Sequence, residues 1–207
     1  MVTILTKNLL YSNITILYNY NNKEGNIMDS ISNKEASLLG LLCEKPKHAY
    51  EIEMDIKERD MRYWTEISMS SVYKLLKKLE ERKFLKSEVK LSKNNVAQKI
   101  YSLTDQGKNL FKEKLKELVS TWQPSIHPVD IGLANLNLLN KQDAIKELNK
   151  YSESIDKMIK CYIELEKFLM NSKCPLGNIQ LATRRIYLLK GEKKWLNDFQ
   201  EDFVNEG

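Results

Sequence analysis

The spacing of hydrophobic residues changes period within the stretch from Ser68 to Leu103. Apolar residues first recur at intervals of three and four, as on the buried face of a helix, with Ser68 as the predicted N-cap; they are Val72, Leu75, Leu76 and Leu79. From Leu85 to Leu91 apolar or small residues alternate with charged ones, which predicts a strand with one buried side. Turn residues over 92–96 and a second alternating stretch over 98–103 follow. The stretch therefore predicts the last helix and the β-hairpin wing of a winged helix-turn-helix.

Two more helices are predicted upstream of this stretch. Ser32 and Glu35 have the S-x-x-E spacing of a capping box, which predicts the start of a leucine-rich helix that ends before Pro46. A second amphipathic helix follows, with Ala49 and Ile56 on the same face. Three helices and a hairpin complete the predicted module.

The chain after the hairpin is predicted to be helical. Thr104 is the candidate N-cap of a helix whose apolar stripe reaches Trp122, and the break between Pro124 and Pro128 is interpreted as a domain boundary. A short apolar helix over 130–139 comes next, and Asn140 then caps a long helix. That helix repeats apolar residues at alternating intervals of three and four, a heptad seam that another helix must cover.

A last helix, after a break at 173–177, predicts an antiparallel helical hairpin. The apolar faces are wide enough to predict contact with a second subunit as well. The positions assigned to this dimerisation contact are Leu148, Tyr151, Ile155, Met158, Tyr162, Leu165, Leu169, Ile186, Leu189 and Leu196. The predicted fold is mostly α, with a winged helix-turn-helix DNA-binding domain over 28–123 and a C-terminal dimerisation domain, an antiparallel helical hairpin, over 124–207.

Residues 1–27 differ from the rest of the chain, because they mix aliphatic residues with asparagine and tyrosine without helical periodicity. They have neither the apolar length of a membrane span nor the pattern of a signal peptide. Codons for Lys23-Glu24-Gly25 can read AAGGAGG, a bacterial ribosome-binding sequence, and Met28 follows shortly afterwards. We interpret residues 1–27 as a non-native or disordered extension and expect mass spectrometry to place the native N-terminus at Met28.

Positive charge is concentrated in the predicted helix and wing. Between Ser68 and Leu103 there are nine lysine and arginine residues and three glutamates, a net charge of +6, whereas the whole chain carries +5. This concentration is typical of a nucleic-acid-binding surface. The plainer alternative is a solvated lysine-rich face, but the helix-and-hairpin context favours DNA.

The remaining composition disfavours other classes of function. Three cysteines without a C-x-x-C pair, and two histidines, give no zinc-site spacing. Cys43 and Cys161 are expected to be buried thiols, and the cysteine usage suits a reducing cytoplasm. No paired nucleophile and base and no glycine-rich phosphate loop are evident, so we predict neither an enzyme nor a cofactor.

Three segments resemble the PadR family of bacterial transcriptional regulators. They are LLGLLCEKPKHAYEI at 38–52, the W-x-x-x-S-x-S-S-V-Y-K-L-L-K-K-L-E pattern at 64–80, and KIYSLTDQGK at 99–108. The resemblance covers about Ile31 to Trp122. The chain departs from the family at Ala49, where glycine is usual, and at Met69-Ser70, where a Pro-Gly or similar pair is common. These departures bear on DNA sequence preference and leave the fold intact.

Helix-turn-helix proteins usually bind pseudo-palindromic double-stranded DNA as two-fold dimers, with one recognition helix in each major groove. The residues assigned to direct groove contact are Ser70, Ser71, Tyr73, Lys74 and Lys77. Those assigned to phosphates or the minor groove are Lys78, Lys93, Asn94, Asn95 and Lys99. Tyr50 is added from its position in the family, with core packing as the equal alternative.

The resemblance also implies a repressor that small aromatic or hydrophobic compounds release. Trp64, Trp122 and Trp195 could line a pocket for such an effector, but aromatic residues on amphipathic helices are more often core residues. No effector residue is therefore assigned. A winged-helix adaptor that meets an acidic protein partner is the alternative function.

Overall fold

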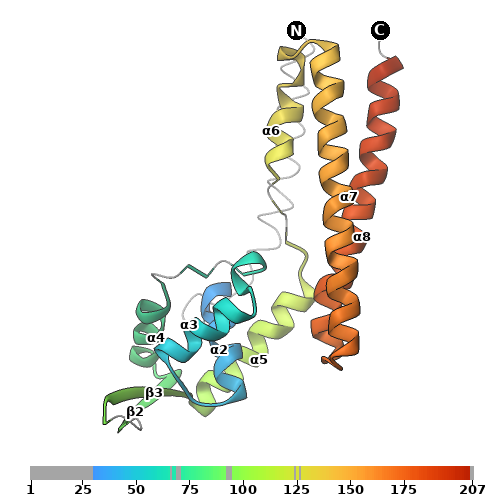
Figure 1. Ribbon diagram of the computed structural model, residues 1–207. Coiled ribbons are helices and arrows are strands. Elements are labelled where there is room, and N and C mark those ends of the chain that lie inside the picture. Colours follow the sequence, from blue (N-terminus) through green and yellow to red (C-terminus); the bar gives the residue numbers. More distant parts are fainter. Residues whose placement is uncertain are drawn as a thin grey trace, which may run out of the picture. The chain divides into compact units, whose positions relative to one another are not determined.

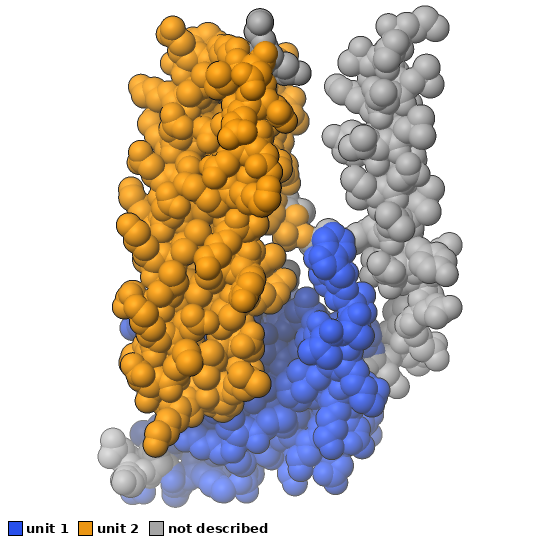
Figure 2. Space-filling view, turned by 90° about the vertical axis from the view of Figure 1, so that its right-hand side faces the viewer, with its two compact units in different colours: residues 1–124 blue, residues 125–207 orange. Residues whose placement is uncertain are grey.

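The computed structural model describes residues 30–65, 67–68, 71–91, 95–123, 125 and 127–205, which form two compact units that divide after Pro124 (Figures 1 and 2). Unit 1 contains α2 (Asn33–Glu44), β1 (Lys47–His48), α3 (Ala49–Glu58), the 3₁₀ helix η1 (Met61–Tyr63), α4 (Val72–Glu81), β2 (Leu85–Leu91), β3 (Ala97–Leu103) and α5 (Asp105–Ser120). Unit 2 contains α6 (Pro128–Ala134), the 3₁₀ helix η3 (Leu136–Leu138), α7 (Lys141–Asn171) and α8 (Leu176–Asn205). The predicted class, a winged helix-turn-helix followed by a helical hairpin, is confirmed. The expectations for residues 1–27 lie outside the described residues.

Local capping sets most helix starts in unit 1. The predicted capping box at the start of α2 is present: the Glu35 amide donates to Ser32 Oγ at 3.2 Å, and the Ser32 amide donates to Glu35 Oε2 at 2.8 Å. Thr104 caps α5 by accepting from the Gly107 amide at 3.0 Å. The prediction for α4 was wrong in detail, because its N-cap is Ser71. That hydroxyl makes no cap bond and instead donates to the Ser68 carbonyl at 2.6 Å.

The core of unit 1 lies among α2, α3, α4 and the base of the hairpin. α4 contributes three of its four predicted residues, Val72, Leu76 and Leu79, each fully buried, while Leu75 is half-buried at the edge of the core. β3 is the central strand of a three-stranded antiparallel sheet in the order β1-β3-β2. The two-residue β1 was not predicted, because a strand this short has no period of its own in the sequence.

Unit 2 is the predicted antiparallel hairpin of α7 and α8, preceded by α6 and η3 (Figure 1). Asn140 caps α7 by accepting from the Asp143 amide at 2.9 Å. Lys173, in the connection to α8, has a left-handed φ of 54°. No helix among the described residues has the length and apolar character needed to cross a membrane.

The expectation that Cys43 and Cys161 are buried was wrong, because both are exposed. Each lies within an apolar stretch of sequence but on the outer side of its helix. Within the described part of the chain, no three histidine, cysteine or acidic residues are placed to hold a metal ion.

Candidate nucleic-acid interface

The outer face of α4 is polar, aromatic and positively charged, while its inner face is fully buried. Tyr73 is 62% exposed, and Lys74 and Lys77 point to solvent. Lys77 lies 3.8 Å from Glu81 in a loose i,i+4 pair, and Lys74 has no ion-pair partner among the described residues. Because a lysine that is free of carboxylates keeps its charge available, this face is suited to a polyanion.

Lys78 is on the same helix but is directed towards α2. Its Nζ lies 3.0 Å from Oε1 of Glu35, a side chain that is only 1% exposed. Burial by itself would raise the pKa of Glu35, but hydrogen bonds from Ser32 and Lys78 outweigh it and lower that pKa. Arg82 lies 3.5 Å from the same oxygen and donates to the Ser30 carbonyl at 3.0 Å. The carboxylate thus joins the start of α2 to α4, and a phosphate would have to compete with it for Lys78.

The wing extends beyond the core. Its paired rows run from Leu85–Leu103, both buried, to Leu91–Ala97, where Leu91 is 70% exposed. Asn95, at the turn, has a left-handed φ of 57°, a conformation that asparagine tolerates well. Ser70, Lys93 and Asn94 fall outside the described residues, so their predicted contacts stay predictions.

Lys99 in the wing is paired with an acidic side chain from α4. Its Nζ lies 2.7 Å from Oε2 of Glu80, whose Oε1 also accepts a hydrogen bond from the Ser87 hydroxyl. These contacts lower the pKa of Glu80, with the Lys99 hydrogen bond as the largest cause. Lys99 was predicted to hold a phosphate, and in the protein alone it already has an anionic partner.

An open hollow of about 270 Å³ lies between the start of α3, the outer face of α4 and the wing. Its lining residues are His48, Ala49, Tyr50, Tyr73, Gln98, Lys99 and Tyr101. Tyr50 is 64% exposed and stacks on the His48 ring with the centroids 6.2 Å apart. A helix N-terminus with its partial positive charge, three phenols and an amide therefore converge on one surface, a set that suits a phosphate, while the ammonium group of Lys99 is held by Glu80.

His48 and Gln98 were not predicted as part of this surface. His48 caps α3 with its ring, since the Glu51 amide donates to Nδ1 at 3.2 Å and the His48 amide donates to Glu51 Oε2 at 3.0 Å. The H-x-x-E spacing was the available signal, because it matches a capping box with histidine in place of serine. For Gln98 the sequence carried no signal beyond its place in a strand.

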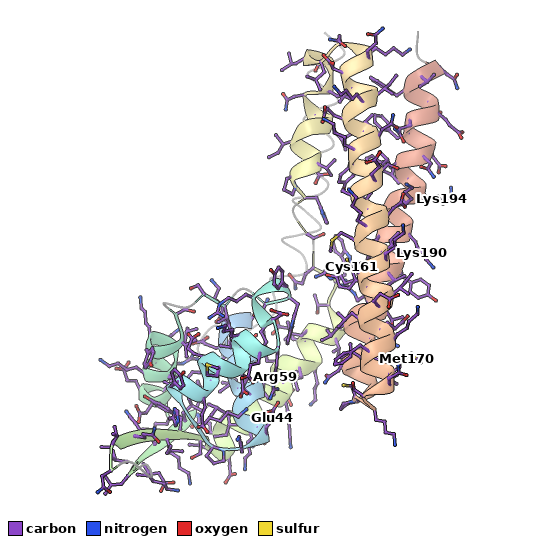
Figure 3. All side chains as sticks on the ribbon, viewed as in Figure 1. Glu44, Arg59, Cys161, Met170, Lys190 and Lys194 are labelled. Atoms are coloured by element: carbon purple, nitrogen blue, oxygen red, sulfur yellow. The ribbon has the colours of Figure 1, made fainter. Side chains whose placement is uncertain are left out.

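An ion-pair network surrounds the buried side chain of Lys47; Figure 3 labels two of its members, Glu44 and Arg59. Lys47 on β1 is 1% exposed and pairs with Asp55 and, at 2.9 Å, with Glu44. Burial would lower the pKa of Lys47, but the hydrogen bonds to these two carboxylates raise it. Glu44 also accepts a forked pair of hydrogen bonds from Arg59, one of them at 2.8 Å, and its pKa falls to about 2 chiefly for that reason. The network joins α2, β1 and α3.

The positions assigned to dimerisation divide into three groups by burial in the single chain. Leu148, Ile155, Ile186 and Leu196 are buried within the hairpin, so a second subunit does not reach them while the hairpin is intact. Tyr151, Tyr162, Leu169 and Leu189 are half-buried. Met158 and Leu165 are exposed, at 44% and 42%.

The division follows from helix geometry, because a seam with a strict seven-residue repeat rotates by about 20° per heptad around a straight helix. The seam faces α8 near Leu148, whereas by Leu165 this rotation has turned it towards solvent. Ile159 takes the inward place between them. Phe168, at 65% exposed, continues the outward stripe.

The tryptophans do not gather around the hollow. Trp64 and Trp122, in unit 1, are 46% and 76% exposed, and Trp195, in unit 2, is 37% exposed and stacks on Phe199 with the ring centroids 5.7 Å apart. The alternative prediction, that these tryptophans are core residues, is therefore wrong for Trp122 in the single chain.

Comparison with known proteins identifies a family model and several similar folds. Residues 38–113 match the model of the transcriptional regulator PadR-like family. Bacillus subtilis PadR in complex with operator DNA aligns with a TM-score of 0.66 and 21% identity, over 82% of this chain and 98% of that chain. The same protein in complex with p-coumaric acid aligns with a TM-score of 0.62 and 21% identity, over 84% and 99% of the two chains.

The Vibrio cholerae virulence activator AphA has a TM-score of 0.59 and 16% identity, over 84% of this chain and 99% of that chain. No curated protein matches the sequence. At these identities the structural likenesses show a shared fold.

Proposed function

We propose that the chain, whose residues 38–113 match the model of the PadR-like family of transcriptional regulators, is a member of that family and a dimeric bacterial repressor, acting in the cytoplasm, that binds a pseudo-palindromic operator. In this proposal a small aromatic or hydrophobic compound releases the protein from DNA. The observation that carries it is the outer face of α4, where Lys74 and Lys77 are open to solvent while the inner face is fully buried.

α4 is proposed to enter the major groove. Lysine donates to guanine O6 and N7, and serine hydroxyls contact any base, so Lys74 and Lys77 supply base selectivity and Ser70 and Ser71 are permissive. The hollow beside Tyr50 is proposed to take a backbone phosphate. Lys93, Asn94 and Asn95 at the wing turn are proposed to reach phosphates or the minor groove.

The second subunit is proposed to cover the outward stripe of α7, made of Met158, Cys161, Leu165 and Phe168. An exposed apolar stripe of this length is unusual on a monomer, because it leaves hydrophobic surface in water. The homologous fold in complex with p-coumaric acid supports an effector of similar chemistry here.

Gel retardation with DNA from upstream of the gene tests the proposal. The Lys74→Ala variant should weaken specific binding by about 10–100-fold for each half-site, which corresponds to one lost base contact of about 1–3 kcal/mol in each subunit. Lys146→Ala is the matched control, since it removes the same charge from an exposed position of unit 2, and its affinity should change less than about twofold. Equal effects of the two changes would assign α4 no special role.

The salt dependence of binding measures the proposed phosphate contacts, separately from the base contact of Lys74. If each subunit neutralises about three to five phosphates, the slope of log K against log salt should be about −5 to −9 for the dimer. A binding constant insensitive to salt contradicts the proposed wing and phosphate contacts. Retained dimerisation without any specific retardation would instead favour the protein-interaction adaptor.

A further inference from the structure

The carboxylate of Glu80 connects α4 to both strands of the wing. It accepts hydrogen bonds from Ser87 on β2 and, at 2.7 Å, from Lys99 on β3, and its side chain is 27% exposed. Lys99 also lies over the ring of Tyr101, 5.2 Å from its centroid. We call these contacts of Glu80 with Ser87 and Lys99 the Glu80 bridge.

The Glu80 bridge is placed where the wing leaves the core. Ser87 is paired with Tyr101, which is 8% exposed, whereas two pairs further along the hairpin Lys99 is paired with Val89, which is 71% exposed. Core packing therefore fixes the hairpin as far as the Ser87–Tyr101 pair, and the Glu80 bridge fixes it two pairs further, as far as Lys99.

The geometry of the hairpin amplifies any movement at this row. From Lys99 to the turn residue Asn95 the strand rises by about 13 Å, at about 3.3 Å per residue. A rotation of about 10° at the bridge would move the turn by about 2 Å, which is enough to break a hydrogen bond made there. The angle between α4 and the wing thus depends on this row.

A carboxylate on a surface that faces DNA has an electrostatic cost, because it repels phosphate. Glu81 and Glu88 are also present on α4 and the wing, but they are 64% and 60% exposed and each has one lysine partner. Glu80 differs from them in being mostly covered and in joining three elements. Its contacts are those of a structural group.

We propose that Glu80 is a positioning residue for DNA recognition, which fixes the wing relative to α4 so that both fit the same stretch of duplex. The proposal rests on the proposed function. In this proposal Lys99 contributes by holding Glu80 in place, and it does not contact a phosphate directly.

Two isosteric variants test the proposal in the full-length protein. Glu80→Gln breaks the ion pair, and Glu81→Gln removes the same charge one residue away, so the two variants change the field at the DNA surface alike. Affinities are measured for the upstream fragment that the wild type retards and for an unrelated duplex of equal length. In E80Q the ratio of specific to non-specific affinity should fall about tenfold, whereas in E81Q it should stay within about twofold of wild type.

Exchanging the charges of Glu80 and Lys99 distinguishes a positioning role of this pair from a direct contact of Lys99 with DNA. Glu80→Lys and Lys99→Glu should each lower the ratio, and the double variant, which restores an ion pair of opposite direction, should recover most of the loss. Hydrogen exchange of the wing amides in the free protein should be faster in E80Q than in E81Q and slow again in the double variant.

The outcomes distinguish this proposal from the one it rests on. Wild-type protein without specific DNA binding would overturn the proposed function. Specific binding by the wild type, with equal ratios in E80Q and E81Q or with no recovery in the double variant, would overturn only the role of Glu80.

Discussion

Replacing Asp55 by alanine should destabilise unit 1 by about 2–3 kcal/mol, because the change leaves the ammonium group of Lys47 with one carboxylate in place of two. Lys47 is 1% exposed, so water does not reach it to compensate. Removing one partner of a buried pair typically costs about 3–5 kcal/mol. The expected value is lower here because Glu44 remains, 2.9 Å away.

The control is Lys47→Met, which removes the buried charge itself. Asp55 keeps a neighbour in this variant, since Arg59 Nη2 lies 3.7 Å from its Oδ1, and its side chain is 22% exposed. Replacing a buried charge by an apolar side chain of similar length is often neutral or stabilising. K47M should therefore change the stability by no more than about 1 kcal/mol.

Urea unfolding of the full-length protein, with hydrogen exchange of residues 30–123 as the probe, reports unit 1 separately from the hairpin. For a unit of this size, D55A should lower the melting temperature by about 10–20 °C. If K47M proves as destabilising as D55A, an uncompensated buried ammonium group is not the source of the cost, and the electrostatic reasoning is refuted.

Three further predictions concern particular side chains. Gly107→Ala should destabilise unit 1 by about 1–3 kcal/mol in urea unfolding, because a Cβ at this position would clash with the Phe84 carbonyl oxygen. Gly191→Ala is the control: the space around this glycine is open, so the change should stabilise α8 by about 1 kcal/mol. Leu196→Ala should cost about 2–5 kcal/mol in hairpin stability, measured by exchange of α7 and α8 amides, because the side chain is fully buried. The pKa of Glu44 is about 2, below its usual 4.5, so its contribution to stability is complete above about pH 5 and is lost as the pH falls towards 2. Unfolding titrations of wild type and Glu44→Gln should converge at low pH, and parallel curves would contradict the assigned cause.

Features set by neighbours in the sequence were predictable. The Ser32–Glu35 capping box, the Thr104 and Asn140 caps and the buried stripe of α4 depend on residues within one or two helical turns, so their spacing alone identifies them. The alternation over Leu85–Leu91 likewise indicated the wing. The outer face of α4 follows directly, since the residues opposite a buried stripe must be exposed.

Features set by contacts distant in the sequence were not predictable. The strand β1 exists because Lys47 and His48 pair with β3, more than fifty residues later, and the burial of Lys47 depends on that pairing. The Glu80 bridge needs α4, β2 and β3 at once, so the sequence showed Lys99 as a free charge available to DNA. In α7, the heptad pattern showed an apolar seam but not which part of it α8 covers.

The sequence by itself determined the elements, their order and the concentration of positive charge, because helix periodicity, capping and strand alternation act over a few residues. The tertiary structure decided which charges are free and which are neutralised, and which apolar residues are left uncovered. The physical reason is that ion pairs and burial depend on distance in space, and a chain of 207 residues brings distant positions to within a few ångströms only when it folds.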